Sequence, residues 1–178
     1  DEKLGKPWIV HRLDAQTSGV CVIARLDISH RFLNLAFSER RVRKEYDALS
    51  QGAPVLPSTM LKDPIEGKPA STQLRVLERF STSTPPCFLG RLRPVTGRRH
   101  QIRIHLKNQG FSILGDTAYG GAKKFQMGGA TVSVGRVALH AAELELPQAS
   151  GRKPWPMFSA PWPEDFVAWI AALRSGTT

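Results

Sequence analysis

The alternation of apolar and polar residues predicts several strands. Residues 42–50 alternate with a period of two, which places Lys44 and Tyr46 on the same face of a strand. Residues 72–79 and 88–95 predict two further strands, paired across a loop rich in serine, threonine and proline. These three segments indicate that much of the chain is sheet.

A fourth strand is predicted in the last third of the chain. Val137, Leu139 and Ala141 alternate with polar residues, and Leu144 continues the pattern after a slip in phase. Because one extra residue moves the following side chains to the other face, we expect a β-bulge near Ala142.

Three segments have the period of about 3.6 residues that is typical of amphipathic helices. Residues 28–39 carry apolar side chains at this spacing, and Asp27 is the expected N-cap. Residues 98–108 predict a second helix that Gly110 stops. Pro163 can begin a third, C-terminal helix, because proline is favoured in the first helical turn.

The apolar run at residues 20–24 predicts a strand buried on both faces, with Cys21 as a small core residue. Residues 51–69 are rich in glycine, proline and serine and predict a loop. A chain of 178 residues is long enough for one domain with a sizeable core. The elements together are consistent with an α+β fold.

Composition fits a soluble globular protein, with 41% hydrophobic and 22% charged residues. No apolar run reaches the roughly eighteen residues of a membrane span, and no signal-peptide pattern is present. Cys21 and Cys87 are too few for a disulfide framework. No histidine–cysteine group has zinc spacing, and no glycine-rich nucleotide loop occurs. We therefore expect a cytoplasmic protein, or an organellar one in a eukaryote.

The formal net charge of +10 is the clearest indication of a partner. Arginines cluster at residues 40–43 and again at residues 91–103. A positive excess of this size favours a polyanion, and nucleic acid is the ordinary one. The alternatives are a solvated basic surface or a protein that binds anionic lipid. We find no basic amphipathic helix of the membrane-surface kind, so nucleic acid is favoured.

Asp14 is the only acidic residue within residues 8–25, and it lies beside Arg12 before a polar turn. A carboxylate next to an arginine, on a loop that enters a buried strand, is placed like a catalytic group. A lone aspartate before a polar turn is more often a turn or capping residue. Likewise, Tyr46 alone indicates a core-edge tyrosine, and Arg103 alone indicates an arginine on a helix surface.

Three stretches taken together change these interpretations. They read HRLDAQTSG at residues 11–19, VRKEYDAL at residues 42–49 and RPVTGRRHQIRIHL at residues 93–106. In this order and spacing they resemble the signature of the RluA-type family of RNA pseudouridine synthases. The resemblance extends over nearly the whole chain through smaller landmarks at residues 67–72, 115–120, 139–141 and 158–166.

The resemblance implies the pseudouridine synthase fold: a single catalytic domain with a mixed, largely antiparallel sheet, flanking helices and a basic active-site cleft. It also implies isomerisation of specific uridines to pseudouridine in structured RNA, either ribosomal or transfer RNA. This intramolecular transfer breaks the bond from ribose C1′ to uracil N1 and forms a bond from C1′ to C5. No group is lost from the RNA and no redox change occurs, so we expect no cofactor and no metal.

The resemblance assigns catalysis to Asp14, Tyr46 and Arg103. Asp14 is the essential carboxylate, acting either as a nucleophile or as a base toward the sugar, and Arg103 pairs with it and favours its ionised form. Tyr46 packs on the uracil and is a candidate for the proton transfer from C5. Arg12 enters the space that the extruded uridine leaves. RNA contacts are expected from a wider set of basic residues: Arg12, His11, Lys44, Arg98, Arg99 and His100.

Two other classes of protein remain open. One is an RNA-binding module or an inactive fragment of such an enzyme. The resemblance implies a strand-rich segment before the HRLD stretch, so we expect residues 1–178 to be a catalytic domain without its N-terminal segment and with no separate RNA-binding domain visible. The other is a glycosidase, which needs a second acid. Asp116 is its only candidate, and its setting in GDTAYGG indicates a turn. RNA is the one partner that the sequence indicates, with no membrane or obligate protein partner.

Overall fold

The computed structural model describes residues 6–151 and 153–175. Its central sheet consists of β2 (Ser18–Gly19), β4 (Arg43–Gln51), β5 (Ser58–Leu61), β6 (Thr72–Phe80), β7 (Cys87–Pro94), β10 (Leu139–Glu145) and β11 (Met157–Ser159). Two small sheets are formed by β1 (Trp8–Ile9) with β3 (Ile23–Ala24) and by β8 (Lys124–Met127) with β9 (Ala130–Ser133). The helices are α1 (Asp27–Ser38), α2 (Gln101–Asn108) and α3 (Glu164–Ser175), with a short 3-10 helix η1 (Thr117–Tyr119). None of these described helices is long and apolar enough to cross a membrane.

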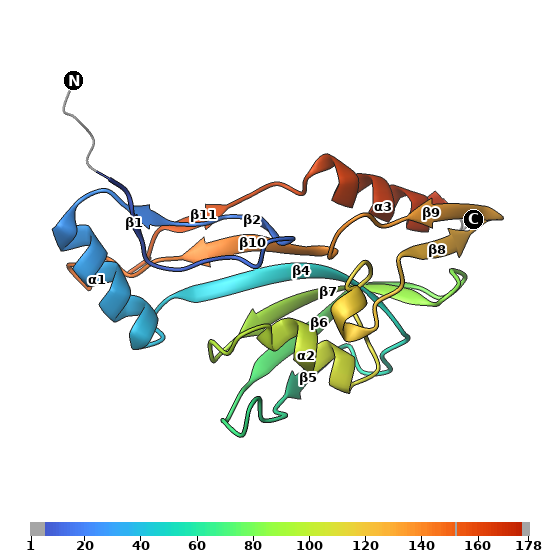
Figure 1. Cartoon of the computed structure of the whole chain (residues 1–178), viewed down its shortest axis with the longest axis horizontal. Helices are drawn as coiled ribbons and strands as arrows, with labels where there is room; N and C mark the ends of the chain where they lie inside the picture. Colours follow the sequence, from blue (N-terminus) through green and yellow to red (C-terminus); the bar gives the residue numbers. More distant parts are fainter. Residues whose placement is uncertain (1–5, 152, 176–178) are drawn as a thin grey trace.

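The seven strands of the central sheet run in the order β11-β10-β4-β7-β6-β5, and β2 pairs with β10 outside this path (Figure 1). Every pairing in this sheet is antiparallel except the parallel one between β2 and β10. The predicted α+β fold with a mixed, largely antiparallel sheet is therefore confirmed. The shift in register between Ala141 and Glu143, where β10 pairs with β4, confirms the predicted bulge.

Alternation along the strands gives the sheet two distinct faces. Tyr46 pairs with Leu92 across β4 and β7, and the next pair along is Asp47 with Arg91. Neighbouring residues of a strand point to opposite faces, so these two pairs lie on opposite sides. We call the side of Tyr46 the site face and the side of Asp47 the rear face.

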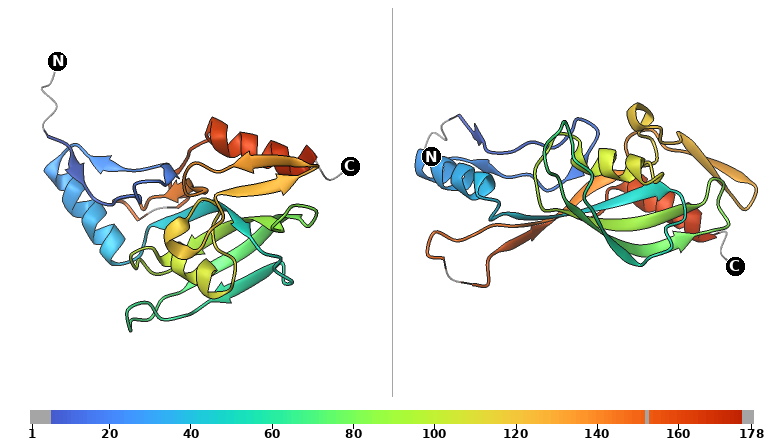
Figure 2. Two further views of the ribbon diagram at one scale, coloured as in Figure 1. Left: turned by 45° about the vertical axis from the view of Figure 1, so that its right-hand side comes forward. Right: turned by 90° about the horizontal axis from the view of Figure 1, so that it is seen from below.

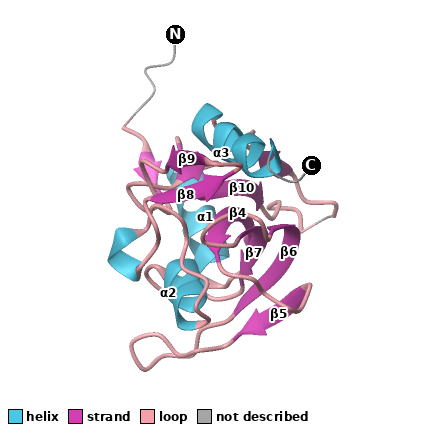
Figure 3. Cartoon of the chain, turned by 90° about the vertical axis from the view of Figure 1, so that its right-hand side faces the viewer, coloured by secondary structure: helices cyan, strands magenta, loops and turns pink. Residues whose placement is uncertain are grey.

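Helices cover both faces of the sheet. On the site face, α2 contributes Ile102 to a cavity that Tyr46 also lines. On the rear face, Trp162, just before α3, donates a hydrogen bond from Nε1 to Asp47 (2.8 Å). Figure 3 shows α2 and α3 on different sides of the twisted strands. Helix α2 thus lies beside the cavity, and both α2 and α3 contribute side chains to the main core.

The core is divided in two. The larger cluster is made by the central strands with α2, α3 and the β8–β9 hairpin, and its fully buried members include Leu92, Leu106 and Phe166. A smaller cluster around Leu33 and Ala36 lies beneath α1. Figure 2 shows α1, β1 and β3 gathered at one end of the molecule, with α3 and the β8–β9 hairpin at the other.

The strand predicted at residues 20–24 is present only at its end, and its predicted burial on both faces is wrong. Only Ile23–Ala24 and the preceding Ser18–Gly19 are paired, and they belong to different sheets. Because the segment passes from one sheet to another, no neighbour covers both of its sides, and Cys21 and Ile23 are exposed. The core position predicted for Cys21 is therefore wrong, whereas Cys87 is buried.

Three element boundaries also differ from those predicted. The segment 51–69 is not all loop, because β5 pairs with β6 along the edge of the sheet. Asp27 is the first residue of α1 rather than its cap, and Leu26 holds the cap position without a side-chain hydrogen bond. Helix α2 begins at Gln101, because His100 before it has a left-handed backbone (φ 53°) that cannot continue a helix.

Candidate active site

A cavity of about 190 Å³ opens on the site face between β4, α2 and the loop that follows β1. This is smaller than the roughly 300–1,000 Å³ of sites for drug-sized ligands, and it suits a group the size of one base. Its charged and titratable lining residues are Arg12, Asp14, Lys44, Tyr46, Arg98, His100 and Arg103. Asp14 is the only carboxylate among these described lining residues, so the cavity is basic around one acid.

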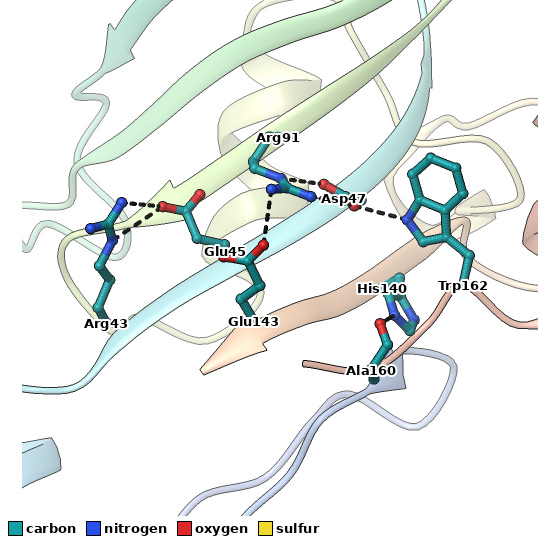
Figure 4. Close-up of polar contacts among 8 residues, drawn as sticks. All are labelled: Arg43, Glu45, Asp47, Arg91, His140, Glu143, Ala160 and Trp162. Atoms are coloured by element: carbon teal, nitrogen blue, oxygen red, sulfur yellow. Dashed lines mark hydrogen bonds and ion pairs between the residues drawn. The ribbon is translucent and has the colours of Figure 1, made fainter. Parts of the chain in front are cut away.

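Asp14 lies in the loop between β1 and β2. Its carbonyl accepts a hydrogen bond from the backbone N–H of Thr17 (2.9 Å), so it does form the turn that its local sequence predicts. The loop ends where β2 pairs with β10, and the Ser18 hydroxyl lies 2.9 Å from Nδ1 of His140. Nε2 of His140 lies 3.0 Å from the Ala160 carbonyl (Figure 4). The turn is thus tied to the middle of the molecule, with a third of the Asp14 side chain exposed (32%).

Arg103 reaches Asp14 from α2. Its Nη1 donates a hydrogen bond to Oδ2 of Asp14 at 3.2 Å. The arginine itself is buried, which contradicts the surface position that a single helical arginine would suggest. A buried guanidinium requires acceptors for its remaining N–H groups.

Asp116 supplies those acceptors. Nε and Nη2 of Arg103 each donate to one Asp116 oxygen at 2.7 Å, and the aspartate is 1% exposed. Such a two-point pair fixes the plane of the guanidinium as well as its position. The hydrogen bond to Asp116 is the main cause that raises the pKa of Arg103, and Asp14 adds to it. Arg103 is therefore a fixed cation that presents its remaining nitrogen, Nη1, to Asp14.

His100 and Tyr119 complete the surroundings of Asp14 and Arg103. His100 Nε2 lies 3.8 Å from Oδ2 of Asp14, and its Nδ1 lies 2.8 Å from the Tyr119 hydroxyl. The Arg103 guanidinium lies 4.8 Å from the centroid of the Tyr119 ring. The turn that contains Asp116 thus also supplies an aromatic ring against the arginine.

Tyr46 and Lys44 enter the cavity from successive site-face positions of β4. Burial, followed by the charge of Asp14, raises the pKa of Tyr46 to about 12. Its hydroxyl is therefore protonated at neutral pH. Burial lowers the pKa of Lys44 from its usual value.

The start of α2 is organised by the side chain of Gln101. Its Oε1 accepts hydrogen bonds from the Thr96 hydroxyl (2.6 Å) and from the backbone N–H of Arg98 (3.0 Å). Its Nε2 donates to the Ser71 carbonyl (2.9 Å). Gln101 therefore ties the first turn of α2 to the segment before it and to Ser71, which fixes the rotation of the helix that presents Arg103.

The structure brings most of the predicted RNA-contacting residues to the cavity, but not all. Arg12, Lys44, Arg98 and His100 line it, together with the three predicted catalytic residues. Arg99 is exposed on the turn before α2, outside the lining.

His11 also lies outside the cavity lining. Its Nε2 accepts a hydrogen bond from the backbone N–H of Val22 (2.9 Å), and its ring stacks on Phe37 at 4.8 Å between centroids. Burial and the nearby charge of Lys44 lower the pKa of His11. These contacts attach the loop before Asp14 to α1.

Sequence reasoning missed Asp116 as a functional residue. Its turn setting was recognised, and the backbone does turn there, since Gly121 N–H donates to the Asp116 carbonyl (2.8 Å). A turn does not reveal where a side chain points. The available signal was the need of Arg103 for acceptors other than Asp14.

The fold and the cavity define a class of protein: an α+β sheet protein with one carboxylate, held by a buried arginine, in a basic cleft. The family model for RNA pseudouridylate synthase matches residues 1–108, and the chain belongs to this family. The chain is 38% identical over 183 residues to an uncharacterized RNA pseudouridine synthase of Chloroflexus aurantiacus, covering 95% of this chain and 54% of that protein. It is 34% identical over 187 residues to the ribosomal large subunit pseudouridine synthase D of Haemophilus ducreyi, covering 94% and 56%.

Solved structures agree with these relatives. The human RNA pseudouridylate synthase domain containing 4 superimposes with a TM-score of 0.74 at 25% identity, covering 97% of this chain and 78% of that chain. The human RNA pseudouridylate synthase domain containing 1 superimposes with a TM-score of 0.68 at 26% identity, covering 96% of this chain and 81% of that chain. The chain spans about half the length of the curated relatives that it matches.

Proposed function

We propose that this chain is the catalytic domain of an RNA pseudouridine synthase, which isomerises uridine to pseudouridine in structured RNA. The observation that carries the proposal is the Asp14–Arg103–Asp116 chain of contacts at the basic cavity. Relatives named as ribosomal large subunit synthases support ribosomal RNA as the substrate class. The cytoplasm, or an organelle in a eukaryote, is the compartment we propose.

Asp14 is the reacting carboxylate in this proposal. Arg103 and His100 both approach its Oδ2, which leaves Oδ1 without a hydrogen-bond partner among the described residues. Oδ1 is therefore the oxygen available to attack ribose C1′ or to take a proton from the sugar. In either route the fixed cation compensates the charge of the carboxylate without having to reorganise during the reaction.

Tyr46 acts as a neutral phenol. Because the pKa of Tyr46 is about 12, the side chain is not ionised at neutral pH and cannot accept the C5 proton as a phenolate. Its ring can pack on the detached uracil, and its hydroxyl can accept the C5 proton only while passing its own proton on. The tyrosine is thus a packing group and a relay rather than a resting base.

The cations around the cavity bind the RNA backbone and replace the extruded base. Arg12 is exposed at the cavity and Arg98 is half-buried beside it, with its Nε donating to the Pro69 carbonyl (3.2 Å). Arginine recognises phosphate in two-point geometry, and base extrusion costs a few kcal/mol that such contacts offset. We propose Lys44 and His100 as further contacts inside the cavity, and Arg99 as one outside it.

The two other classes are less well supported. A glycosidase needs a second acid near the first, and both Asp116 oxygens are already bound to Arg103. An inactive RNA-binding module would not need Arg103 to be buried and held against Asp14, because burying a charged side chain costs free energy. His11, although predicted to contact RNA, is better explained as a positioning residue for the Asp14 loop.

The test is tritium release from ribosomal and transfer RNA labelled at uridine C5, with wild-type protein and Asp14→Asn. We expect release by the wild type only, and RNA binding within a few fold of wild type for the variant, because asparagine keeps the shape of the side chain but not its charge. Comparable release by Asp14→Asn would remove Asp14 from the mechanism. Release by neither protein, with tight RNA binding by both, would favour the binding module.

A further inference from the structure

The rear face of the sheet carries a row of arginines. Arg75 of β6 pairs directly with Arg91 of β7, and Arg93 pairs with Gln73. Cross-strand partners share a face, and Arg91 lies on the face of Asp47. Residues two apart along a strand also share a face, so these arginines stand together on the side opposite the cavity.

Two adjoining hollows follow this row. One is lined by residues that include Arg75, Arg91, Arg93 and Arg43. The other shares Arg43 and Arg93 with it and continues toward the turn after α1. We call the combined surface the rear basic groove and define it by the cations Arg40, Arg41, Arg43, Arg75, Arg93 and Lys153.

Some arginines of this face are already neutralised (Figure 4). Arg91 donates from Nε and Nη2 to the two oxygens of buried Asp47, at 2.8 and 3.0 Å, and from Nη1 to Glu143 at 3.1 Å. Arg43 donates to Glu45 at 3.0 Å. Arg91 is therefore a structural residue that has no edge to spare for a ligand.

Arg41 is paired with Glu39 at 2.7 Å, but the remaining cations of the groove are not neutralised. Arg40, Arg75, Arg93 and Lys153 have no acidic side chain within ion-pair distance among the described residues. Like charges gathered on one surface repel each other, and they bind polyanions with release of counterions. The groove thus has both the unpaired charge and the shape to bind a phosphate backbone.

The groove is continuous with the candidate active site. Pro94, the last residue of β7, lines both the active-site cavity and the nearer of the two rear hollows. Val95 beyond it lines the same hollow and is exposed. A strand that leaves the cavity can therefore pass around the end of β7 to the rear face without crossing the body of the protein.

We propose that the rear basic groove binds the phosphodiester backbone of the RNA strand that flanks the target uridine. This proposal rests on the proposed function, because it takes the active-site cavity as the place of that uridine. At the far side of the groove, the Lys153 ammonium lies 5.1 Å from the Trp155 ring centroid. An aromatic ring beside cations is a platform on which an unpaired base can stack.

The test compares Arg75→Gln/Arg93→Gln with the control Lys123→Gln/Lys124→Gln, which removes the same charge from exposed residues at the β8–β9 hairpin. Each protein binds fluorescent oligouridine of about 25 nucleotides and of about 5 nucleotides, since a binding site for single strands spans about 4–16. For the long RNA we expect about tenfold weaker binding by the groove variant at low salt. The slope of log K against log salt should fall by about 1.4, because each single-strand phosphate contact contributes about 0.7.

The short RNA and the control variant should bind as wild type does. An equal loss for the short RNA, or for the control, would overturn the proposal, and so would an unchanged slope for the long RNA. Neither arginine side chain makes a hydrogen bond among the described residues, so glutamine should preserve the fold. The exposed single variant Arg75→Gln should give half the change in slope. Binding is read without turnover, so failure of the groove and failure of the synthase activity are distinguishable.

Discussion

Asp116 determines what Arg103 can do for Asp14. Two of the three guanidinium nitrogens of Arg103, Nε and Nη2, donate to Asp116 at 2.7 Å, and the third, Nη1, donates to Asp14 at 3.2 Å. Without the first contact the guanidinium could rotate and bind Asp14 in two-point fashion, which would occupy the carboxylate that we propose as the reacting group. Asp116 is therefore a positioning residue, although it does not touch the cavity.

We expect Asp116→Asn to lower single-turnover tritium release by at least about tenfold while RNA affinity stays within a few fold of wild type. Stability should also fall, by about 3 kcal/mol in chemical denaturation, because the variant breaks a buried ion pair. The control is Asp47→Asn, which breaks the comparably buried two-point pair with Arg91 (2.8 Å) on the rear face. If both variants lost turnover equally, general destabilisation rather than positioning would explain the effect.

At this scale, only part of the site could be predicted from the sequence. Asp14, Tyr46 and Arg103 could be predicted because they stand in motifs of recognisable order, and the structure places all three at one cavity. The proton on Tyr46 could not be predicted, because its pKa depends on burial and on the distance to Asp14. The same holds for His11, whose ring contacts come from a different element.

Among the elements, β2 decides where the Asp14 loop ends. Gly19 has φ +118°, and a methyl group built there would overlap the backbone of Ala141 in β10. Only glycine permits both this backbone and the close approach of the two strands. The parallel pairing of β2 with β10 thus depends on a single residue that follows the HRLD stretch.

Gly19→Ala should destabilise the protein by at least about 2 kcal/mol and should lower turnover further than RNA binding, since the loop that carries Asp14 loses its anchor. The matched control is Gly135→Ala, where no atom lies within 4 Å of the added carbon and the backbone needs no positive φ. It should stay within about 0.5 kcal/mol of wild type. Thermal denaturation measures both variants. Equal melting temperatures would show that β2 can move away from β10 without loss of stability, which would contradict the prediction.

Strands could be predicted from the sequence where a strand stays within one sheet along its whole length. β6 alternates between buried and exposed positions because only one of its sides faces the core. β4, β7 and β10 each contain four successive buried residues, where both sides of the strand are covered, and each is paired on both edges within the same sheet. The segment after Gly19 could not be predicted in this way. The chain passes from one sheet to another between Ser18 and Ala24, and apolar side chains of this segment are partly exposed. An apolar run records only that burial is favourable, not whether a neighbour is present to provide it.

For the whole molecule, the division of the core predicts uneven stability. Helix α1 packs on the small cluster around Leu33 and Ala36, and its Ile28 and Leu35 are exposed at 76% and 52%. The central strands and α2 share the larger cluster. Segments with few buried contacts open locally at lower free energy than the global transition.

Amides in the last two turns of α1 should therefore exchange with solvent through local opening, at a free energy at least about 2 kcal/mol below that of β4 amides. Helix α2 is the internal comparison, because it is also short but packs in the larger cluster, and its amides should follow β4. Native-state hydrogen exchange monitored residue by residue measures all three. Equal protection of α1 and β4 would indicate one cooperative unit.

The sequence by itself determined the period of the main strands, the excess of positive charge and the residues of three motifs, because these are properties of local order and composition. Tertiary structure decided which charges remain available to a ligand. Arg91 is ion-paired with Asp47 and Glu143, whereas Arg75 and Arg93 on the same face have no acidic partner among the described residues. Tertiary structure also decided that Asp116 meets Arg103, thirteen positions away along the chain. Pairing of side chains depends on distances that only the folded backbone sets, and no local pattern encodes them.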